Sequence, residues 1–209
     1  MNDIAAPIVA TEVTPKLRQI IEAAEQLFLS HGYGAVSMDQ VSRTANVSKA
    51  TLYAYFPSKD ALFATIVRNK GFDNPFTEDL FPNDVTDLRA ALEEIGNRML
   101  HFMLRERTLS IYRVALAEAA RFPELGIAFY DNGPRSMFDR FAIWIEHLRE
   151  LNFVQTTDSH LATEQFCALV RSGVFLRRSL AVPPAASEEE IISTVTAAVD
   201  TWLRAYAQP

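Results

Sequence analysis

Residues 37 to 56 carry side chains suited to contacting a polyanion. Ser48, Lys49 and Thr51 begin a short segment that continues to Tyr53 and Tyr55. Hydroxyl groups and the N–H groups at a helix N-terminus donate to phosphate oxygens, and a lysine supplies positive charge. Short or basic side chains in a first helical turn also permit close approach to base edges in the major groove. These residue types favour a helix that contacts duplex DNA, with an ordinary solvated surface as the alternative.

Two helical patterns precede this segment. Thr14 is an N-cap followed by Pro15 at the first helical position, and apolar residues recur every 3.6 residues from there to Gly32. Ser37 begins a second helix, in which Gln40 completes a capping box. The sequence therefore predicts one long helix and one short helix before the DNA-contacting segment.

The segment itself predicts a third short helix, and a fourth follows it. Ser48 caps the third helix, and its residues Leu52 and Phe56 point toward a common core. Pro57 ends it because proline has no N–H to donate, and the fourth helix starts at Ser58. Two short helices joined by three residues are not stable alone, so the first and fourth helices must clamp them. This arrangement has the dimensions of a helix-turn-helix.

The rest of the chain predicts further amphipathic helices after a connector at residues 71 to 83. Gly133-Pro134 is expected to break the chain between two of them, and Pro183-Pro184 to reverse it so that the last two pack antiparallel. Because no segment has the two-residue period of a strand, the predicted fold is all-α. Its expected parts are a loose arm at 1–13, a helix-turn-helix DNA-binding domain at 14–70, and a ligand-binding and dimerisation domain at 71–209.

The charge is distributed unevenly along the chain. The net charge is −6, yet residues 1–70 hold seven Lys or Arg against six Asp or Glu, while residues 71–209 hold thirteen against twenty. The acidity therefore lies outside the predicted DNA-binding domain. Cys167 is the single cysteine, which excludes an intrachain disulfide and suits a reducing cytoplasm. Charges interrupt every apolar stretch before it reaches the length of a membrane span, so no membrane association is expected.

Several blocks of the first 67 residues resemble the TetR family of transcription regulators. They are the pattern Ile20 to Phe28 with Gly32-Tyr33, the block Val47 to Tyr53, and Phe56 followed by Ser58 to Leu62. The resemblance implies phosphate contacts from Ser37, Thr51, Tyr53, Tyr55 and Lys59, and base contacts from Lys49, Ala50 and Tyr53. Thr44 and Ser48 complete the set of expected DNA contacts. Many members have glycine in place of Ala50 and histidine in place of Tyr55, so their base preference does not transfer.

The second part resembles a narrower group, the AefR-like regulators. The matching blocks are Tyr112 to Ala115, Glu118-Ala119, Arg121 to Leu125, Phe129-Tyr130, Gly133-Pro134, Glu164 to Phe166, Gly173 to Leu176 and Val199 to Tyr206. The resemblance implies a homodimer whose effector binds in this domain.

Large apolar residues at helical spacing are candidates for an effector pocket. Core packing is expected for most of them, and a minority would line a cavity for a flexible hydrophobic ligand. The candidates are Met99, Phe102, Met103, Tyr112, Phe129, Phe138, Phe141, Trp144 and Phe166.

The last two helices are expected to form the dimer interface, with packing inside one subunit as the alternative. A glycine at mid-helix, Gly173, costs about 1 kcal/mol unless a close approach requires it. In the TetR family the last two long helices of each subunit build a four-helix interface. The expected interface residues are Ala162, Phe166, Leu169, Gly173, Leu176, Leu180, Val195, Val199 and Trp202.

The sequence as a whole predicts a ligand-controlled regulator, with repression favoured and activation as the alternative. Its three expected partners are palindromic duplex DNA, a small hydrophobic ligand and a second copy of itself. The alternative is an all-helical carrier or enzyme whose first domain is only structural. No GxGxxG, P-loop, GxSxG or HExxH pattern occurs, and the four histidines show no helical pairing suited to a metal. We therefore expect no enzymatic activity, no cofactor and no bound metal.

Overall fold

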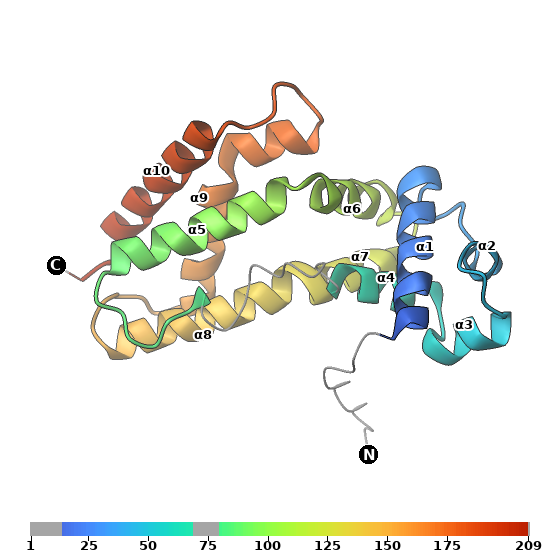
Figure 1. The fold of residues 1–209 in the computed structure, drawn as a ribbon. Coiled ribbons are helices and arrows are strands. Elements are labelled where there is room, and N and C mark those ends of the chain that lie inside the picture. Colours follow the sequence, from blue (N-terminus) through green and yellow to red (C-terminus); the bar gives the residue numbers. More distant parts are fainter. Residues whose placement is uncertain (1–13, 69–79, 209) are drawn as a thin grey trace, which may run out of the picture.

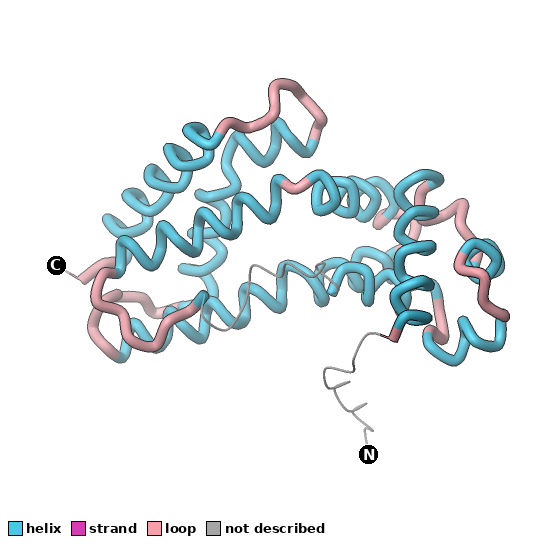
Figure 2. The backbone as a smooth tube through the Cα atoms, in the orientation of Figure 1, coloured by secondary structure: helices cyan, strands magenta, loops and turns pink. Residues whose placement is uncertain are grey.

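The computed structural model describes residues 14–68 and 80–208, and these ranges are helical apart from their connecting loops (Figures 1 and 2). Within them, the β pairing is a single isolated antiparallel bridge between Val154 and Ala207, so the predicted all-α fold is confirmed. The elements are α1 (Pro15–His31), α2 (Met38–Thr44), α3 (Lys49–Tyr55), α4 (Lys59–Arg68), α5 (Leu88–Leu104), α6 (Glu106–Glu118), α7 (Pro123–Tyr130), the π-helical η2 (Asp131–Arg135), α8 (Ser136–Glu150), α9 (Ser159–Ser179) and α10 (Glu188–Tyr206).

Some of the predicted features lie outside the described residues, namely the arm at 1–13, most of the connector and the domain boundary at 70 and 71. None of the helices in the described ranges combines the length and apolar character that a membrane span needs.

The helices gather at two ends of an elongated molecule. α1 to α4 form one end, α5, α8, α9 and α10 form the other, and α6 and α7 lie between them (Figure 1). Each end has its own cluster of buried apolar side chains. The molecule therefore has two hydrophobic cores, joined through its middle.

The helix starts follow from the predicted caps. The Thr14 hydroxyl accepts from the Leu17 N–H at 3.2 Å, which fixes the start of α1. Ser37 and Gln40 form the predicted reciprocal capping box at α2. At α3, the Ser48 hydroxyl accepts from the backbone N–H of Thr51 at 3.0 Å. These local bonds satisfy N–H groups that have no partner within the helix.

The core of the α1–α4 end is not built by these four helices alone. Ile111 and Ala115 from α6, with Leu125 and Ala128 from α7, belong to the same buried cluster as Phe28 of α1. The DNA-binding domain expected at 14–70 therefore shares its core with residues 40 or more positions further along the chain. Its four helices are held in a fixed position against α6 and α7.

The expected chain break at Gly133-Pro134 is wrong. α7 continues through η2 directly into α8, with Pro134 inside the π-helical segment. The wider π turn accommodates a residue that has no N–H, so the chain need not leave the helical path. A Cβ on Gly133 would lie 3.3 Å from Val67 Cγ1, so the glycine allows η2 to pack closely on the end of α4.

α9 and α10 pack against each other and run in opposite directions, as the Pro183-Pro184 reversal predicts (Figure 1). Trp202 of α10 is buried and donates its indole N–H to the carbonyl of Ala162 in α9 at 2.9 Å. α9 is bent at Ser172, where the backbone leaves the helical region. The bend directs the last two turns of α9 toward Arg113, which donates to the carbonyls of Arg178 and Ser179.

The shared core predicts a sharp difference between two adjacent residues of α1. Phe28 is buried against the rings of Tyr33 and Phe63, whereas Leu29 is on the surface. Phe28→Ala should lower the free energy of unfolding by about 3–5 kcal/mol through lost burial and a cavity. Leu29→Ala should lower it by less than about 1 kcal/mol. Denaturant unfolding followed by circular dichroism measures both, and equal losses would contradict the core described here.

Candidate nucleic-acid interface and ligand cavity

α3 exposes its polar side to solvent because a side chain on its opposite side is buried in the core. Leu52 is fully buried, and Phe56, its C-cap, is also in the core. The hydroxyl-bearing rings of Tyr53 and Tyr55 remain 49% and 40% exposed. An apolar ring left this exposed on a short helix contributes nothing to the core of the subunit, so it is available to a partner surface.

The N-terminus of α3 gathers the predicted polar groups. Ser48, Lys49 and Ala50 are exposed and Thr51 is half-buried. The hydroxyls of Ser48 and Thr51 are hydrogen-bonded to each other at 2.8 Å. Lys49 forms an ion pair with Asp39 of α2, and both side chains are about half exposed or more. Because exposed pairs of this kind contribute little free energy, a phosphate can replace the carboxylate at small cost.

Lys59 requires a correction, because the structure gives its amino group a different use. Its Nζ donates to the carbonyls of Tyr33 at 2.8 Å and Val36 at 2.9 Å, and lies 4.1 Å from the centre of the Tyr33 ring. Burial lowers the pKa of this amino group, although Glu118 and Glu124 raise it. Lys59 therefore ties the α1–α2 loop to α4 and is not held ready for a phosphate.

The other two predicted contacts lie in the loop before α2 and at the end of α2. Ser37 is exposed, and its hydroxyl is engaged in the capping box with Gln40. Thr44 is exposed in the last turn of α2. Arg43, which the sequence reasoning missed, is exposed beside it. A basic residue within the helix-turn-helix would have been a sufficient signal for Arg43.

The α1–α4 end is fastened to the middle of the molecule by two polar contacts. The backbone N–H of Gly34 donates to Glu118 of α6 at 3.1 Å. A Cβ on Gly34 would lie 2.8 Å from both Glu118 Oε2 and the Phe122 ring, so a larger residue there would force these side chains to shift. Arg107 of α6 forms an ion pair with Glu25 of α1 at 2.7 Å. The orientation of α1, and through it that of α3, therefore depends on α6.

A cavity of about 120 Å³ lies between α5, α6, η2, α8 and α9, and the end of α4 reaches it through Val67. Its walls are mainly apolar. Cys167 lies on one wall, and burial raises the pKa of its thiol to about 12, so the thiol stays protonated. An apolar, partly enclosed space of this size is suited to a small hydrophobic molecule.

The structure places most of the predicted pocket residues on this cavity. Those that line it are Met99, Phe102, Met103, Tyr112, Phe129 and Phe138. Phe141, Trp144 and Phe166 do not line it. They form edge-to-face and tilted ring contacts in the core of the far end, with ring centres 5.1 to 5.8 Å apart. Helical spacing marks all nine as inward-facing, but only tertiary packing separates cavity from core.

Three polar cavity residues escaped the sequence reasoning: Arg107, Thr108 and Arg171. Arg171 lies four residues from Cys167 and four from Phe175, and all three line the cavity from α9. An arginine at the centre of an apolar i, i+4, i+8 row was the available signal.

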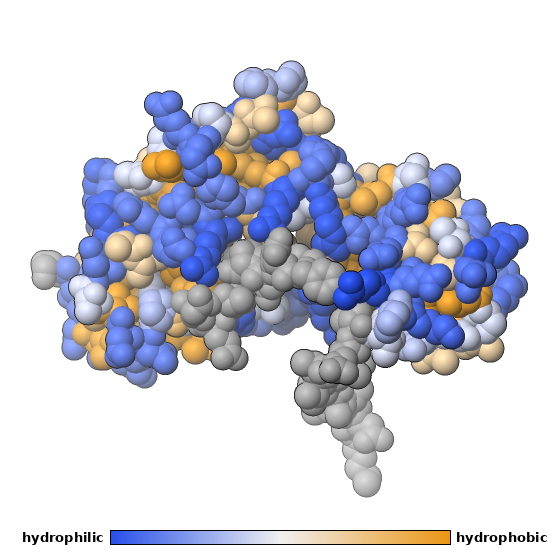
Figure 3. All heavy atoms as spheres, viewed as in Figure 1, coloured by the Kyte–Doolittle hydropathy of each residue, from blue (hydrophilic) through white to orange (hydrophobic). Residues whose placement is uncertain are grey.

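The predicted interface residues divide between the two sides of α9 and α10. Five of them are buried within the subunit and have no surface to offer a partner, so this part of the prediction is wrong: Ala162, Phe166, Val195, Val199 and Trp202. Leu176 and Leu180 are 61% and 68% exposed, Gly173 is exposed, and Leu169 is half-buried. Ile192 of α10 is half exposed as well. Figure 3 shows apolar side chains among polar ones where α9 and α10 reach the surface.

Two family models match the chain, one at each end. Residues 20–66 match the model for bacterial regulatory proteins of the tetR family. Residues 90–208 match the model for the C-terminal domain of AefR-like transcriptional repressors. Together they cover both cores of the molecule.

Relatives match over most of their own length. The uncharacterized HTH-type transcriptional regulator YvkB of Bacillus subtilis is 26% identical over 168 residues, which are 78% of this chain and 83% of that protein. A solved TetR-family transcriptional regulator from Mesorhizobium loti is 26% identical, with a TM-score of 0.80 over 95% of this chain and 100% of that chain. The solved flavonoid-responsive regulator FrrA is 34% identical, with a TM-score of 0.76 over 92% of this chain and 97% of that chain.

The environments of Lys59 and Lys49 predict effects of different size on the free energy of unfolding. Lys59→Met removes two charge-assisted hydrogen bonds to carbonyls and should lower the free energy of unfolding by about 1.5–3 kcal/mol. Lys49→Met removes only an exposed ion pair and should change it by less than about 1 kcal/mol. Thermal and denaturant unfolding measure both. A Lys59 variant as stable as the Lys49 variant would return Lys59 to the list of candidate phosphate contacts.

Proposed function

The chain belongs to the TetR family of transcriptional regulators, with an AefR-like C-terminal domain, and on that premise we propose that it is a repressor released from a palindromic operator by a small hydrophobic effector. The observation that carries the proposal is the exposed polar side of α3, whose only buried side chain is Leu52. A helix of seven residues held in this way enters a major groove with its N-terminal residues first. Lys49, Ala50 and Tyr53 then face bases, and the neighbouring hydroxyls donate to phosphates.

The small number of base pairs that α3 can contact argues for a dimer, and the outer side of α9 and α10 is the proposed interface. One short helix contacts only a few base pairs, so useful specificity requires two copies on successive major grooves. The surface offered by Leu169, Gly173, Leu176 and Leu180 is apolar and contains a glycine whose added Cβ would meet nothing within 4 Å in its own subunit. That open space allows a partner helix to approach closely. The proposal requires a two-fold axis through this surface that leaves the two α3 helices on one face of the dimer.

The cavity supports an aromatic effector. Met and Phe side chains line it, and FrrA, the solved relative described above, is a flavonoid-responsive regulator. Val67 links the cavity to α4, which packs on η2 through Gly133. A ligand that prefers a different packing of these helices would move α4 and the α1–α3 unit with it. Release from DNA requires such a preference, since equal affinity for both states shifts nothing.

A carrier or enzyme with a structural first domain would also use the cavity. That hypothesis does not explain the exposed polar side of α3. The relatives reported above are transcription regulators. Anisotropy titration with duplex DNA from upstream of the chain's own gene, at two salt concentrations, separates the proposals. Tight binding to one site that weakens with salt supports the regulator. Equal affinity for random DNA favours the carrier.

Lys49→Ala should reduce operator affinity without changing thermal stability, because its side chain is exposed and its carboxylate partner is too. If Lys49 contacts a phosphate, the salt dependence of the binding constant should flatten by about one unit of log–log slope. If it contacts a base, discrimination at one base pair should fall by about 1–3 kcal/mol. Arg204→Ala, an exposed arginine of α10, is the control and should bind DNA as the wild type does. Unchanged affinity for the Lys49 variant would remove α3 from the interface.

Gly173→Glu should convert the dimer to monomers, because a carboxylate would be buried in an apolar interface without a partner. The subunit itself has room for the new side chain, so the unfolding temperature should fall only by the amount that dimerisation contributes. Sedimentation velocity measures the outcome, with Leu116→Glu on the exposed side of α6 as the control. A dimeric Gly173→Glu protein would place the interface elsewhere.

A further inference from the structure

The charged side chains that line the cavity in the described ranges are all positive. Arg107 reaches it from α6 and Arg171 from α9, and none of the described residues that line it carries a carboxylate. Arg171 stacks its guanidinium 5.8 Å from the centre of the Phe175 ring, and no ion pair joins it to an acidic residue in the described ranges. A cationic group facing an apolar space gains most from a ligand that brings the opposite charge.

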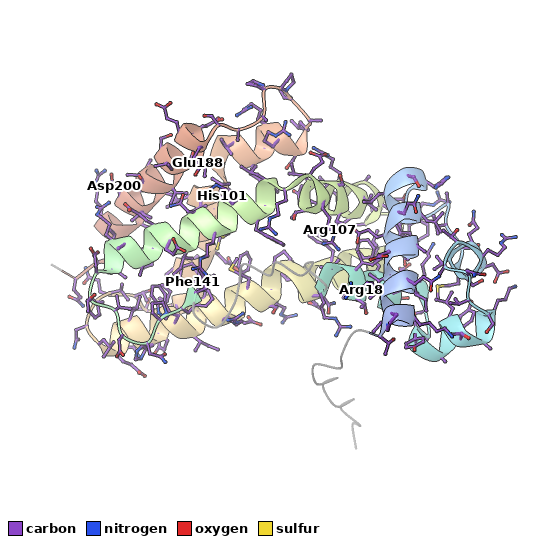
Figure 4. All side chains as sticks on the ribbon, viewed as in Figure 1. Arg18, His101, Arg107, Phe141, Glu188 and Asp200 are labelled. Carbon is purple, nitrogen blue, oxygen red and sulfur yellow. The ribbon has the colours of Figure 1, made fainter. Side chains whose placement is uncertain are left out.

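Arg107 also forms an ion pair outside the cavity. Its guanidinium donates to both carboxylate oxygens of Glu25, with Nε 2.7 Å from Oε1 and Nη2 2.7 Å from Oε2. Glu25 belongs to α1, and its side chain is only 17% exposed. Figure 4 shows Arg107 on α6 next to α1. One side chain therefore borders the cavity and also holds the α1–α4 end by a two-bond ion pair.

We propose that the effector is a small aromatic carboxylic acid, and that its carboxylate takes Arg107 away from Glu25. This inference rests on the proposed function and assigns the chemical class of its effector and the contact through which it acts. The aromatic part lies against the Met and Phe side chains, and the carboxylate accepts from the Arg107 guanidinium, with Arg171 adding positive charge from α9.

The size and the geometry of the site favour this class. A cavity of about 120 Å³ has room for roughly one aromatic ring before side chains move. A guanidinium binds a carboxylate through two parallel N–H donors, which is the arrangement that Arg107 already makes with Glu25. The ligand therefore offers the same pair of N–H donors an equivalent carboxylate within the cavity, so the exchange replaces one ion pair by another.

The exchange of Glu25 for the ligand as the partner of Arg107 explains how ligand binding affects α3. Once Arg107 turns to the ligand, Glu25 is left mostly buried and without its cation, which weakens the contact between α1 and α6. The state with α1 docked is the one that DNA selects. By linkage, operator DNA must weaken the binding of the acid by the same factor as the acid weakens the binding of DNA.

Matched probes separate charge from shape. 3-Phenylpropanoate and 3-phenylpropanamide have the same ring and chain length, but only the first carries an anion. Calorimetric titration of the wild-type dimer in the absence of DNA should show at least about tenfold tighter binding of the carboxylate, as expected for a charged hydrogen-bonded pair. Equal affinities, or no binding of the carboxylate up to millimolar concentration, would overturn the proposal.

Two variants test the role of each partner. Arg107→Gln should abolish the preference for the carboxylate, whereas Arg105→Gln, which removes a neighbouring charge outside the cavity lining, should keep it. Glu25→Gln should raise the affinity for 3-phenylpropanoate about tenfold, because the competing carboxylate of Glu25 is gone. The affinity for 3-phenylpropanamide should not change. Glu22→Gln, one turn earlier on α1 and exposed, should behave as the wild type does. A Glu25 variant with unchanged affinity would show that the two anions do not compete, and would be decisive even if the Arg107 variant fails to fold.

The outcomes distinguish this inference from the proposed function. A protein that binds its operator but releases it equally with both probes, or with neither, retains the proposed function and loses this inference. A protein that prefers the carboxylate and binds no specific DNA retains a carboxylate site at Arg107 and loses the repressor.

Discussion

The α1–α4 end cannot complete its own hydrophobic core, and the rest of the structure depends on this. Phe28, Tyr33 and Phe63 pack ring against ring, and apolar side chains of α6 and α7 close the cluster from the other side. Separating the two parts would expose that surface to water, at a cost of about 25 cal/mol for each Å² of apolar area. The helix that we propose to contact DNA, α3, is therefore oriented by residues of α6 and α7.

This shared core also gives the proposed effector a route by which it would affect α3. Val67 belongs both to the shared core and to the cavity wall, and Gly133 brings η2 against it. Packed interiors respond to an added volume by changing between discrete arrangements, because they contain little free space. A ligand at this wall therefore acts directly on α4. The ion pair of Arg107 with Glu25 provides a second, electrostatic contact across the same boundary.

The sequence predicted what depends on local interactions and missed what depends on tertiary ones. The caps at Thr14, Ser37 and Ser48 involve residues three positions apart, so the helix starts were predictable. Whether Trp202 faces a partner subunit or its own core depends on which helix covers it, and periodicity carries no such information. The chain break expected at Gly133-Pro134 was wrong for a related reason, since the π-helical turn there depends on the packing of α7 and α8 around it.

Three basic residues show how the degree of burial decides what a positive charge does. Lys49 is exposed with an exposed partner, so water already competes for it and a phosphate can take the place of Asp39. Lys59 is committed to two carbonyls beneath an aromatic ring, where desolvation makes any exchange costly, and it acts as a permanent structural link. Arg107 lies between these limits, because its carboxylate partner is mostly buried while its other side borders a cavity. Only a charge of this third kind holds two parts of a protein together and can still be drawn to another anion, and that is the property a ligand-controlled contact requires.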